Sequence, residues 1–195
     1  MLLFGHVGIT TGVVWGWDKY LRHKIPFAKK TTETSISIAT AIDYRLVIIG
    51  SMLPDIIDKP IGHWLFADTF NNFGRIFAHS LLFFFILLSI GLYRYHRSGK
   101  TGVLLLTLCS GFHLLLDSMW HYTQTLFWPL KGWGFPHDEN TNLWEWLSAL
   151  NEGVKSVPLI YISETIGVLI LVFLTFKLWK NKRLLHFIKT GNIHD

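Results

Sequence analysis

The stretch Val103-Leu-Leu-Leu-Thr-Leu-Cys-Ser-Gly-Phe-His-Leu-Leu-Leu-Asp117 places two ionisable side chains inside an apolar segment that continues to Trp128. Ionisable side chains are costly inside a bilayer and usually have a function there. His113 and Asp117 are four residues apart, so they share one face of a helix, and His121 is expected to continue that face. Together His113 and Asp117 could bind one metal ion. The alternative is a hydrogen-bonded pair that only fixes helix packing.

Four further apolar segments occupy residues 2–17, 36–54, 76–93 and 157–176. A membrane-spanning helix needs about 20 apolar residues, which the last two segments approach and the first two do not. The runs are too continuous for alternating barrel strands, and backbone groups in lipid must pair internally. We therefore predict an all-α, multi-pass transmembrane bundle of about five apolar helices. It forms one integral membrane domain, residues 1–195, with a polar cytoplasmic tail at residues 181–195.

The composition agrees with a membrane protein. Half of the 195 residues are hydrophobic and 16% are charged, against about 25% in soluble domains. The net charge of +5 does not indicate nucleic-acid binding, because the basic residues flank the apolar segments and form no stripe of their own. Membrane lipids are the expected neighbours. The single cysteine, Cys109, cannot form an internal disulfide.

The basic residues also predict an orientation. Lys and Arg are frequent at residues 18–35, at residues 94–102 and in the tail from Lys177, and they are fewer at residues 55–75 and 131–156. If all five segments span the cell membrane, the basic connections fall on one side, which is normally cytoplasmic. The C-terminus is then cytoplasmic and the N-terminus lies outside.

Polar candidates outside the fourth segment are weak signals one by one. Pro54 is expected to end the second segment, and an Asp after Pro, such as Asp55, is most often a turn residue. Arg75 and His79 are four apart and would share a helical face; Arg75 could bind phosphate or carboxylate, or extend to the interface. The remaining candidates are His6, Asp58, His63 and Glu164. Under the predicted topology the candidates fall at one depth near the extracytoplasmic side, which indicates a single site.

The ligand chemistry of this set favours a divalent metal ion. Nitrogen and oxygen ligands suit Zn²⁺, with Mn²⁺ or Fe²⁺ as alternatives. A metal with an open position activates water, which is the usual route to hydrolysis. The sequence contains no G-x-S-x-G elbow, P-loop or dinucleotide fingerprint.

The order of these motifs resembles the YdjM-like family, membrane-bound proteins to which metal-dependent hydrolysis is ascribed. The matching elements are Gly5-His6, Leu53-Pro54-Asp55 with Asp58, Arg75 with His79-Ser80, Gly111 with His113 and Asp117, and Trp128-Pro129. The family is distantly similar to zinc-dependent phospholipases C and nucleases, which cleave phosphoesters. The resemblance implies metal roles for Asp55, His79, His113 and Asp117, with His6 nearby. The later His-x-x-x-Glu of the phospholipase group is absent, so one or two ions are expected.

The sequence therefore predicts a membrane-bound metal-dependent hydrolase that acts on a phosphoester or lipid-linked substrate. We expect His6, Asp55, His79, His113 and Asp117 to hold the metal. Asp58 is a candidate ligand or general base, and Arg75 is a candidate clamp for an oxyanion or phosphate. The alternative is a non-catalytic membrane protein, regulatory or related to transport, in which the polar cluster is structural.

Overall fold

The computed structural model of the protein describes residues 1–24, 42–70, 72–136 and 158–193. Within these ranges the regular structure is helical and contains no strand, which confirms the all-α prediction. The long helices are α1 (Leu3–Lys24), α2 (Tyr44–Pro60), α4 (Leu81–Ser98), α5 (Gly102–Leu116) and α8 (Pro158–Lys180). The short ones are a π-helical turn (Ile61–Leu65), α3 (Ala67–Phe70), a 3₁₀ turn (Met119–His121), α6 (Thr123–Leu126) and α9 (Leu184–Thr190).

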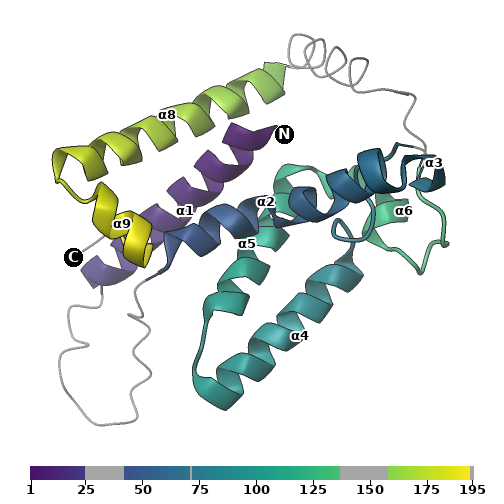
Figure 1. Ribbon diagram of the computed structural model, residues 1–195, viewed down its shortest axis with the longest axis horizontal. Helices are drawn as coiled ribbons and strands as arrows, with labels where there is room; N and C mark the ends of the chain where they lie inside the picture. The colour runs from purple at the N-terminus through teal and green to yellow at the C-terminus, as the bar shows by residue number, and fades with distance from the viewer. Residues whose placement is uncertain (25–41, 71, 137–157, 194–195) are drawn as a thin grey trace.

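The long helices pack in a simple order: α8 contacts α1, α1 contacts α2, α2 contacts α5, and α5 contacts α4 (Figure 1). Helices α4 and α8 therefore lie on opposite sides of the molecule, with α1, α2 and α5 between them. The polar cluster sits among these inner helices. Its side chains come from the beginning of α1, the second half of α2, the end of α5 and the loop before α4.

Helices α1 and α8 approach each other closely through glycine. A Cβ on Gly8 would collide with the backbone of Gly167, and a Cβ on Gly167 would collide with the backbone of Phe4. Small residues at a crossing let helices pack backbone against backbone. Glu164 of α8 also accepts hydrogen bonds from the backbone N–H groups of Leu2 (2.8 Å) and Gly5 (3.0 Å). Glu164 thus pairs N–H groups that the start of α1 cannot pair itself, and is a packing partner.

Helix α2 continues past Pro54 to Pro60, so the prediction that Pro54 ends the second segment was wrong. An internal proline removes one hydrogen bond and costs about 3 kcal/mol. The turns beyond it carry two buried carboxylates that accept hydrogen bonds, Asp55 and Asp58, and these contacts offset that cost. The helix begins at Tyr44; residues 36–41 of the predicted segment lie outside the described residues.

Helix α4 begins at Leu81, so residues 76–80 are not helical as predicted. Ser80 is its N-cap, and its Oγ accepts a hydrogen bond from the backbone N–H of Phe83 at 3.2 Å. Ahead of the cap, Asp58 accepts hydrogen bonds from the backbone N–H groups of Ile76 (2.8 Å), Ala78 (2.9 Å) and His79 (3.1 Å). These bonds hold a loop, so Arg75 and His79 do not share a helical face.

Helix α5 ends at Leu116, well before the predicted Trp128. Ser118 adopts the left-handed conformation (φ 53°), which ends a helix and is uncommon for a residue other than glycine. The chain then turns into the 3₁₀ turn Met119–His121, where His121 is exposed. His113 and Asp117 remain on one face, but the prediction that His121 continues it was wrong.

The predicted polar tail, residues 181–195, includes a docked helix. Arg45 at the start of α2 donates from Nη1 to the carbonyl oxygens of Ile188 (3.1 Å) and Lys189 (2.9 Å) in α9. The backbone N–H of Tyr44 donates to Gly191 O at 2.8 Å. Gly191 has φ +72°, and a Cβ there would collide with the carboxylate of Asp43. The tail therefore packs on the N-terminal end of α2, away from Asp55.

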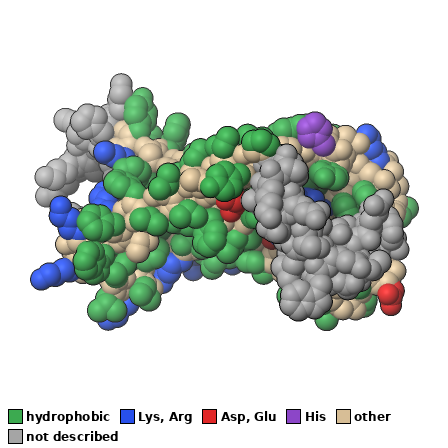
Figure 2. Space-filling model, turned by 90° about the horizontal axis from the view of Figure 1, so that it is seen from above, with side chains coloured by type: hydrophobic (Ala, Val, Ile, Leu, Met, Phe, Trp, Pro, Cys, Tyr) green, Lys and Arg blue, Asp and Glu red, His purple; other side chains and the backbone are tan. Residues whose placement is uncertain are grey.

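The length and exposed side chains of the helices indicate which of them could cross a membrane. By length and composition, one described helix, α8, could cross a bilayer; α5 is apolar but has 15 residues. Figure 2 shows hydrophobic side chains over the middle of the α8 face and Lys and Arg at the end near α9. Helix α4 also exposes apolar side chains, among them Phe85, Ile86 and Ile90. A bundle of about five spanning helices stays a prediction.

Candidate metal centre

His79 is held by the carboxylate of Asp58. Its Nδ1 lies 2.7 Å from Asp58 Oδ2, and Asp58 also accepts three backbone N–H bonds, one of them from His79 itself. A carboxylate that accepts this many donors is ionised, so Nδ1 of His79 carries the proton. A neutral imidazole has one N–H, so Nε2 of His79 presents a lone pair whenever the ring is neutral, as it must be to bind a metal ion. Both side chains are fully buried.

His113 is oriented in the same way by a backbone carbonyl. Its Nδ1 lies 2.7 Å from Ser51 O on α2. A carbonyl oxygen can only accept, so Nδ1 is the donor and Nε2 again presents a lone pair. The close packing of α2 on α5 makes this contact possible: a Cβ on Gly50 would lie 2.9 Å from Cys109 Cβ. His113 is fully buried.

The two Nε2 atoms lie close together. Nε2 of His79 and Nε2 of His113 are 3.3 Å apart. Two lone pairs this close repel each other unless a proton on one nitrogen or a metal ion lies between them. Asp55 Oδ1 lies 3.6 Å from His79 Nε2 and 3.9 Å from His113 Nε2, and Asp117 Oδ2 lies 4.0 Å from His79 Nε2. Nε2 of His113 and one oxygen each of Asp55 and Asp117 thus lie within 4.0 Å of His79 Nε2.

These distances fit a divalent ion. With metal–ligand bonds of about 2.0–2.2 Å, the ligand atoms of a tetrahedral site are about 3.3–3.6 Å apart. The observed separations of 3.3 to 4.0 Å match this spacing or need a contraction of a few tenths of an ångström. The Nδ1 partners, Asp58 and Ser51 O, are of the kind that orient histidines bound to metals. The residues present therefore fit a metal ion.

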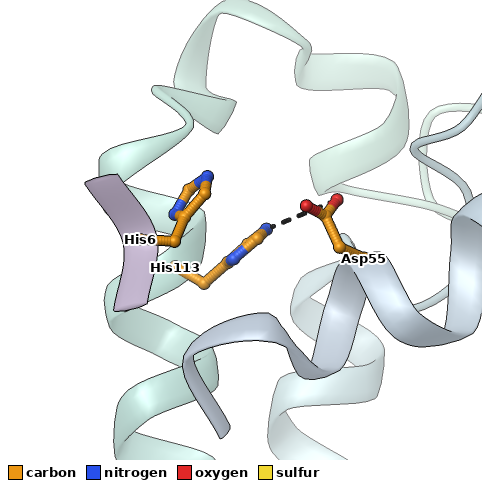
Figure 3. A group of neighbouring side chains, drawn as sticks. All are labelled: His6, Asp55 and His113. Carbon is orange, nitrogen blue, oxygen red and sulfur yellow. Dashed lines mark ion pairs between the residues drawn. The ribbon is translucent and has the colours of Figure 1, made fainter. Parts of the chain in front are cut away.

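His6 lies beside this group. Its ring stacks on His113 with a centroid distance of 4.0 Å and an interplanar angle of 19°. Figure 3 shows the two rings together, with His113 directed at the carboxylate of Asp55. His6 Nε2 lies 2.9 Å from Asp117 Oδ1, to which the α-amino group of Met1 also donates at 2.7 Å. The ligand atoms of His6, Asp55 and His113 lie within 4.8 Å of one another, so His6 is a further candidate ligand beside Asp55 and His113.

Two cations border the buried cluster. Arg75 donates from Nε to Asp117 Oδ2 at 2.9 Å, and its guanidinium lies over the ring of Tyr122, 5.1 Å from the centroid. Lys59 donates from Nζ to Asp55 Oδ2 at 2.8 Å. Their side chains are 33% and 36% exposed, whereas the two carboxylates are at most 5% exposed. These two partly exposed side chains therefore form the border of the cluster.

The structure brings together the seven residues predicted to form the site. His6, Asp55, His79, His113 and Asp117 offer ligand atoms, Asp58 orients His79, and Arg75 lies at the rim. The oxygens of Asp58 are taken by four donors, which favours an orienting role over the predicted role of ligand or base. Three further candidates lie elsewhere: His63 packs on Gly74, His121 is exposed, and Glu164 pairs the start of α1.

Sequence reasoning missed Lys59 and the carbonyl of Ser51. Lys59 is four residues after Asp55, a spacing that pairs side chains on a helix. That signal was hidden because Pro54 was expected to end the helix before Asp55. A backbone carbonyl carries no sequence signal, so the contribution of Ser51 needed the structure.

The fold and the site together define an all-helical protein with a buried His–Asp centre and an apolar helix long enough to cross a bilayer. The sequence profile of the YdjM inner membrane protein family matches residues 1–185. The chain belongs to this family, which places it in the membrane. No curated protein and no solved structure gives a significant match to this chain.

Proposed function

We propose that the protein is a membrane-bound metal-dependent hydrolase that cleaves a phosphoester. The observation that carries this proposal is the pair of imidazole Nε2 atoms 3.3 Å apart, with oxygens of Asp55 and Asp117 within 4.0 Å of His79 Nε2. When both imidazoles are neutral, their two Nε2 atoms and the nearby carboxylate oxygens form a set of ligands that suits one divalent ion. We expect one divalent ion among these atoms, with Zn²⁺ as first choice and His6 as a further candidate ligand.

The chain's own residues have separate tasks in this proposal. A divalent ion would lower the pKa of bound water toward about 7 and polarise a phosphoryl oxygen. Asp58 and Ser51 O keep the Nδ1 protons in place and so keep both Nε2 atoms free for the metal. Arg75 holds Asp117 and offers its remaining N–H groups to developing negative charge. The apolar packing around α1, α2 and α5 excludes bulk water.

The exposed faces of α4 and α8 support a multi-pass arrangement. Helix α8 is mostly uncovered by the rest of the described chain, and α4 exposes apolar side chains on the opposite side of the molecule. Lipid would cover both faces. The distribution of basic residues favours a cytoplasmic C-terminus and a site near the extracytoplasmic side. A phosphoester carried by a lipid would reach such a site from the bilayer.

The test uses detergent-purified protein loaded with Zn²⁺, Mn²⁺ or Fe²⁺ and a panel of soluble and lipid phosphoesters. We expect hydrolysis that requires the metal and is lost in His113→Ala, with His121→Ala as the matched control because His121 is exposed and outside the cluster. Metal content and thermal stability are measured on the same samples. A metal-loaded protein without hydrolysis of any ester, or a His113→Ala variant that loses only stability, would contradict the proposal.

A further inference from the structure

The rim of the metal centre carries two cations whose hydrogen-bonding capacity is only partly used. Lys59 Nζ has three N–H groups and gives one to Asp55 Oδ2 at 2.8 Å. Arg75 gives Nε to Asp117 Oδ2 at 2.9 Å, and its Nη groups have no hydrogen-bond partner among the described residues. Each cation is therefore held by one carboxylate of the cluster and directs spare donors to its exposed side.

The charge of the site depends on these two side chains. The three carboxylates Asp55, Asp58 and Asp117 bring three negative charges to the cluster. A divalent ion and the α-amino group of Met1, which donates to Asp117 at 2.7 Å, would balance them and leave a neutral site. Lys59 and Arg75 raise the sum to two positive charges, which attract an anion. Because both side chains are partly exposed and hold buried carboxylates, this positive charge lies at the border of the cluster.

The chemistry of the two cations suits a tetrahedral oxyanion. Lys59 is anchored on Asp55 and Arg75 on Asp117, and the oxygens of these two carboxylates lie 3.6 Å and 4.0 Å from His79 Nε2, so the cations flank the metal position. The ring of Tyr122 supports the guanidinium plane at 5.1 Å, which limits the directions that its Nη groups can take. A planar fork of donors and an ammonium group are common partners of phosphate.

We propose that Lys59 and Arg75 form a two-cation clamp that binds the phosphate group of the substrate over the metal centre. The inference rests on the proposed function and adds Lys59, with Arg75, as the residues that bind the phosphate group of that phosphoester. Lys59 has a second effect: its ammonium group competes with the metal for the charge of Asp55. Removing it should weaken phosphate binding and leave zinc binding equal or stronger.

The test is calorimetric binding of inorganic phosphate and of Zn²⁺ to the full chain in detergent. We expect Lys59→Met and Arg75→Gln to weaken phosphate binding to the zinc-loaded protein by about tenfold or more. Zinc affinity in Lys59→Met should equal or exceed that of the wild type, and Lys59→Arg should keep phosphate binding. Lys131→Met is the matched control, since Lys131 is exposed over the ring of Phe127.

The outcomes distinguish the phosphate clamp from the metal-dependent hydrolase. Unchanged phosphate affinity in Lys59→Met, or a parallel loss of phosphate and zinc affinity that marks a structural role, overturns the clamp and leaves the metal centre standing. A wild-type protein that binds phosphate through Lys59 but no metal overturns the hydrolase and keeps the clamp. A wild-type protein that binds neither overturns both.

Discussion

Single hydrogen bonds decide which atoms the two central histidines present. Nδ1 of His79 lies against a carboxylate and Nδ1 of His113 against a carbonyl oxygen, so in the neutral form of each ring Nε2 is free to bind a metal. The side chain of Asp58 has the larger task, because it also fixes three backbone N–H groups of the loop before α4. One carboxylate thus sets both the position and the protonation of His79.

Asp58→Asn should lower the affinity for Zn²⁺ by roughly 10- to 100-fold, the usual effect of losing a group that orients a metal ligand. The amide would turn an N–H₂ group toward donors and would no longer stabilise the Nδ1 proton. Chelator competition on the purified protein measures the affinity. The matched control is Asp68→Asn, because Asp68 is exposed on α3. Equal zinc affinity in the two variants would contradict the orienting role.

Asp43→Asn tests the residue that joins α2 to the C-terminal helix. Hydrogen bonds from the Arg45 side chain lower the pKa of Asp43 below its ordinary value, despite partial burial. A carboxyl with a lower pKa in the folded state stabilises the fold above its unfolded pKa. That stability is lost as the pH falls through the folded pKa. The wild type should unfold at a higher temperature than the variant at pH 7, and the difference should shrink below about pH 4.

Calorimetry of both proteins between pH 3 and pH 7 makes this comparison. Asn retains the size of the side chain, so a lower unfolding temperature at neutral pH reports the lost charge and not a cavity. A difference between the two proteins that stays constant down to pH 3 would show that the ion pair with Arg45 does not contribute.

Among the elements, α1 and α8 form the closest contact, and α1 carries His6. Gly8→Ala should lower the free energy of unfolding by about 1–3 kcal/mol, since the added methyl group would overlap the backbone of Gly167 and force the helices apart. It should also displace His6 from His113. Gly16→Ala on the same helix is the control: its added Cβ meets nothing within 4 Å and should stabilise α1 by about 0.5–1 kcal/mol.

Denaturant unfolding followed by circular dichroism gives both values. If Gly8→Ala were as stable as Gly16→Ala, the close crossing of α1 and α8 would be refuted. The His6 contact gives a second observable, because zinc affinity should fall in Gly8→Ala and remain unchanged in Gly16→Ala.

The elements also show what the sequence can predict. The helical class and the shared face of His113 and Asp117 follow from hydropathy and spacing, and the structure has both. The end of α2 could not be predicted, because burial of Asp55 and Asp58 outweighs the local effect of Pro54. The loop before α4 was equally hidden: the apolar residues Ile76 to Ala78 read as helix, and only their contacts with Asp58 make them a loop.

For the whole molecule, the membrane orientation is the open prediction. We expect a Cys109→Ala background with Leu130→Cys to react with an impermeant thiol reagent in intact spheroplasts. Leu130 is 88% exposed and lies beyond α6, at the opposite end of the molecule from α9. Lys180→Cys at the end of α8 should react only after the membrane is permeabilised. The reverse pattern would place the site on the cytoplasmic side and contradict the positive-inside assignment.

For the whole site, we expect four side chains from three separate parts of the chain to bind one divalent ion: Asp55, His79, His113 and Asp117. X-ray absorption spectroscopy of the zinc-loaded protein in detergent tests it most directly, because it reports the kind of ligand atom. We predict a shell of nitrogen and oxygen at about 2.0–2.2 Å with the scattering of two imidazoles. The imidazole scattering should be reduced in His79→Ala. A shell containing sulfur at about 2.3 Å, or zinc without imidazole scattering, would contradict it.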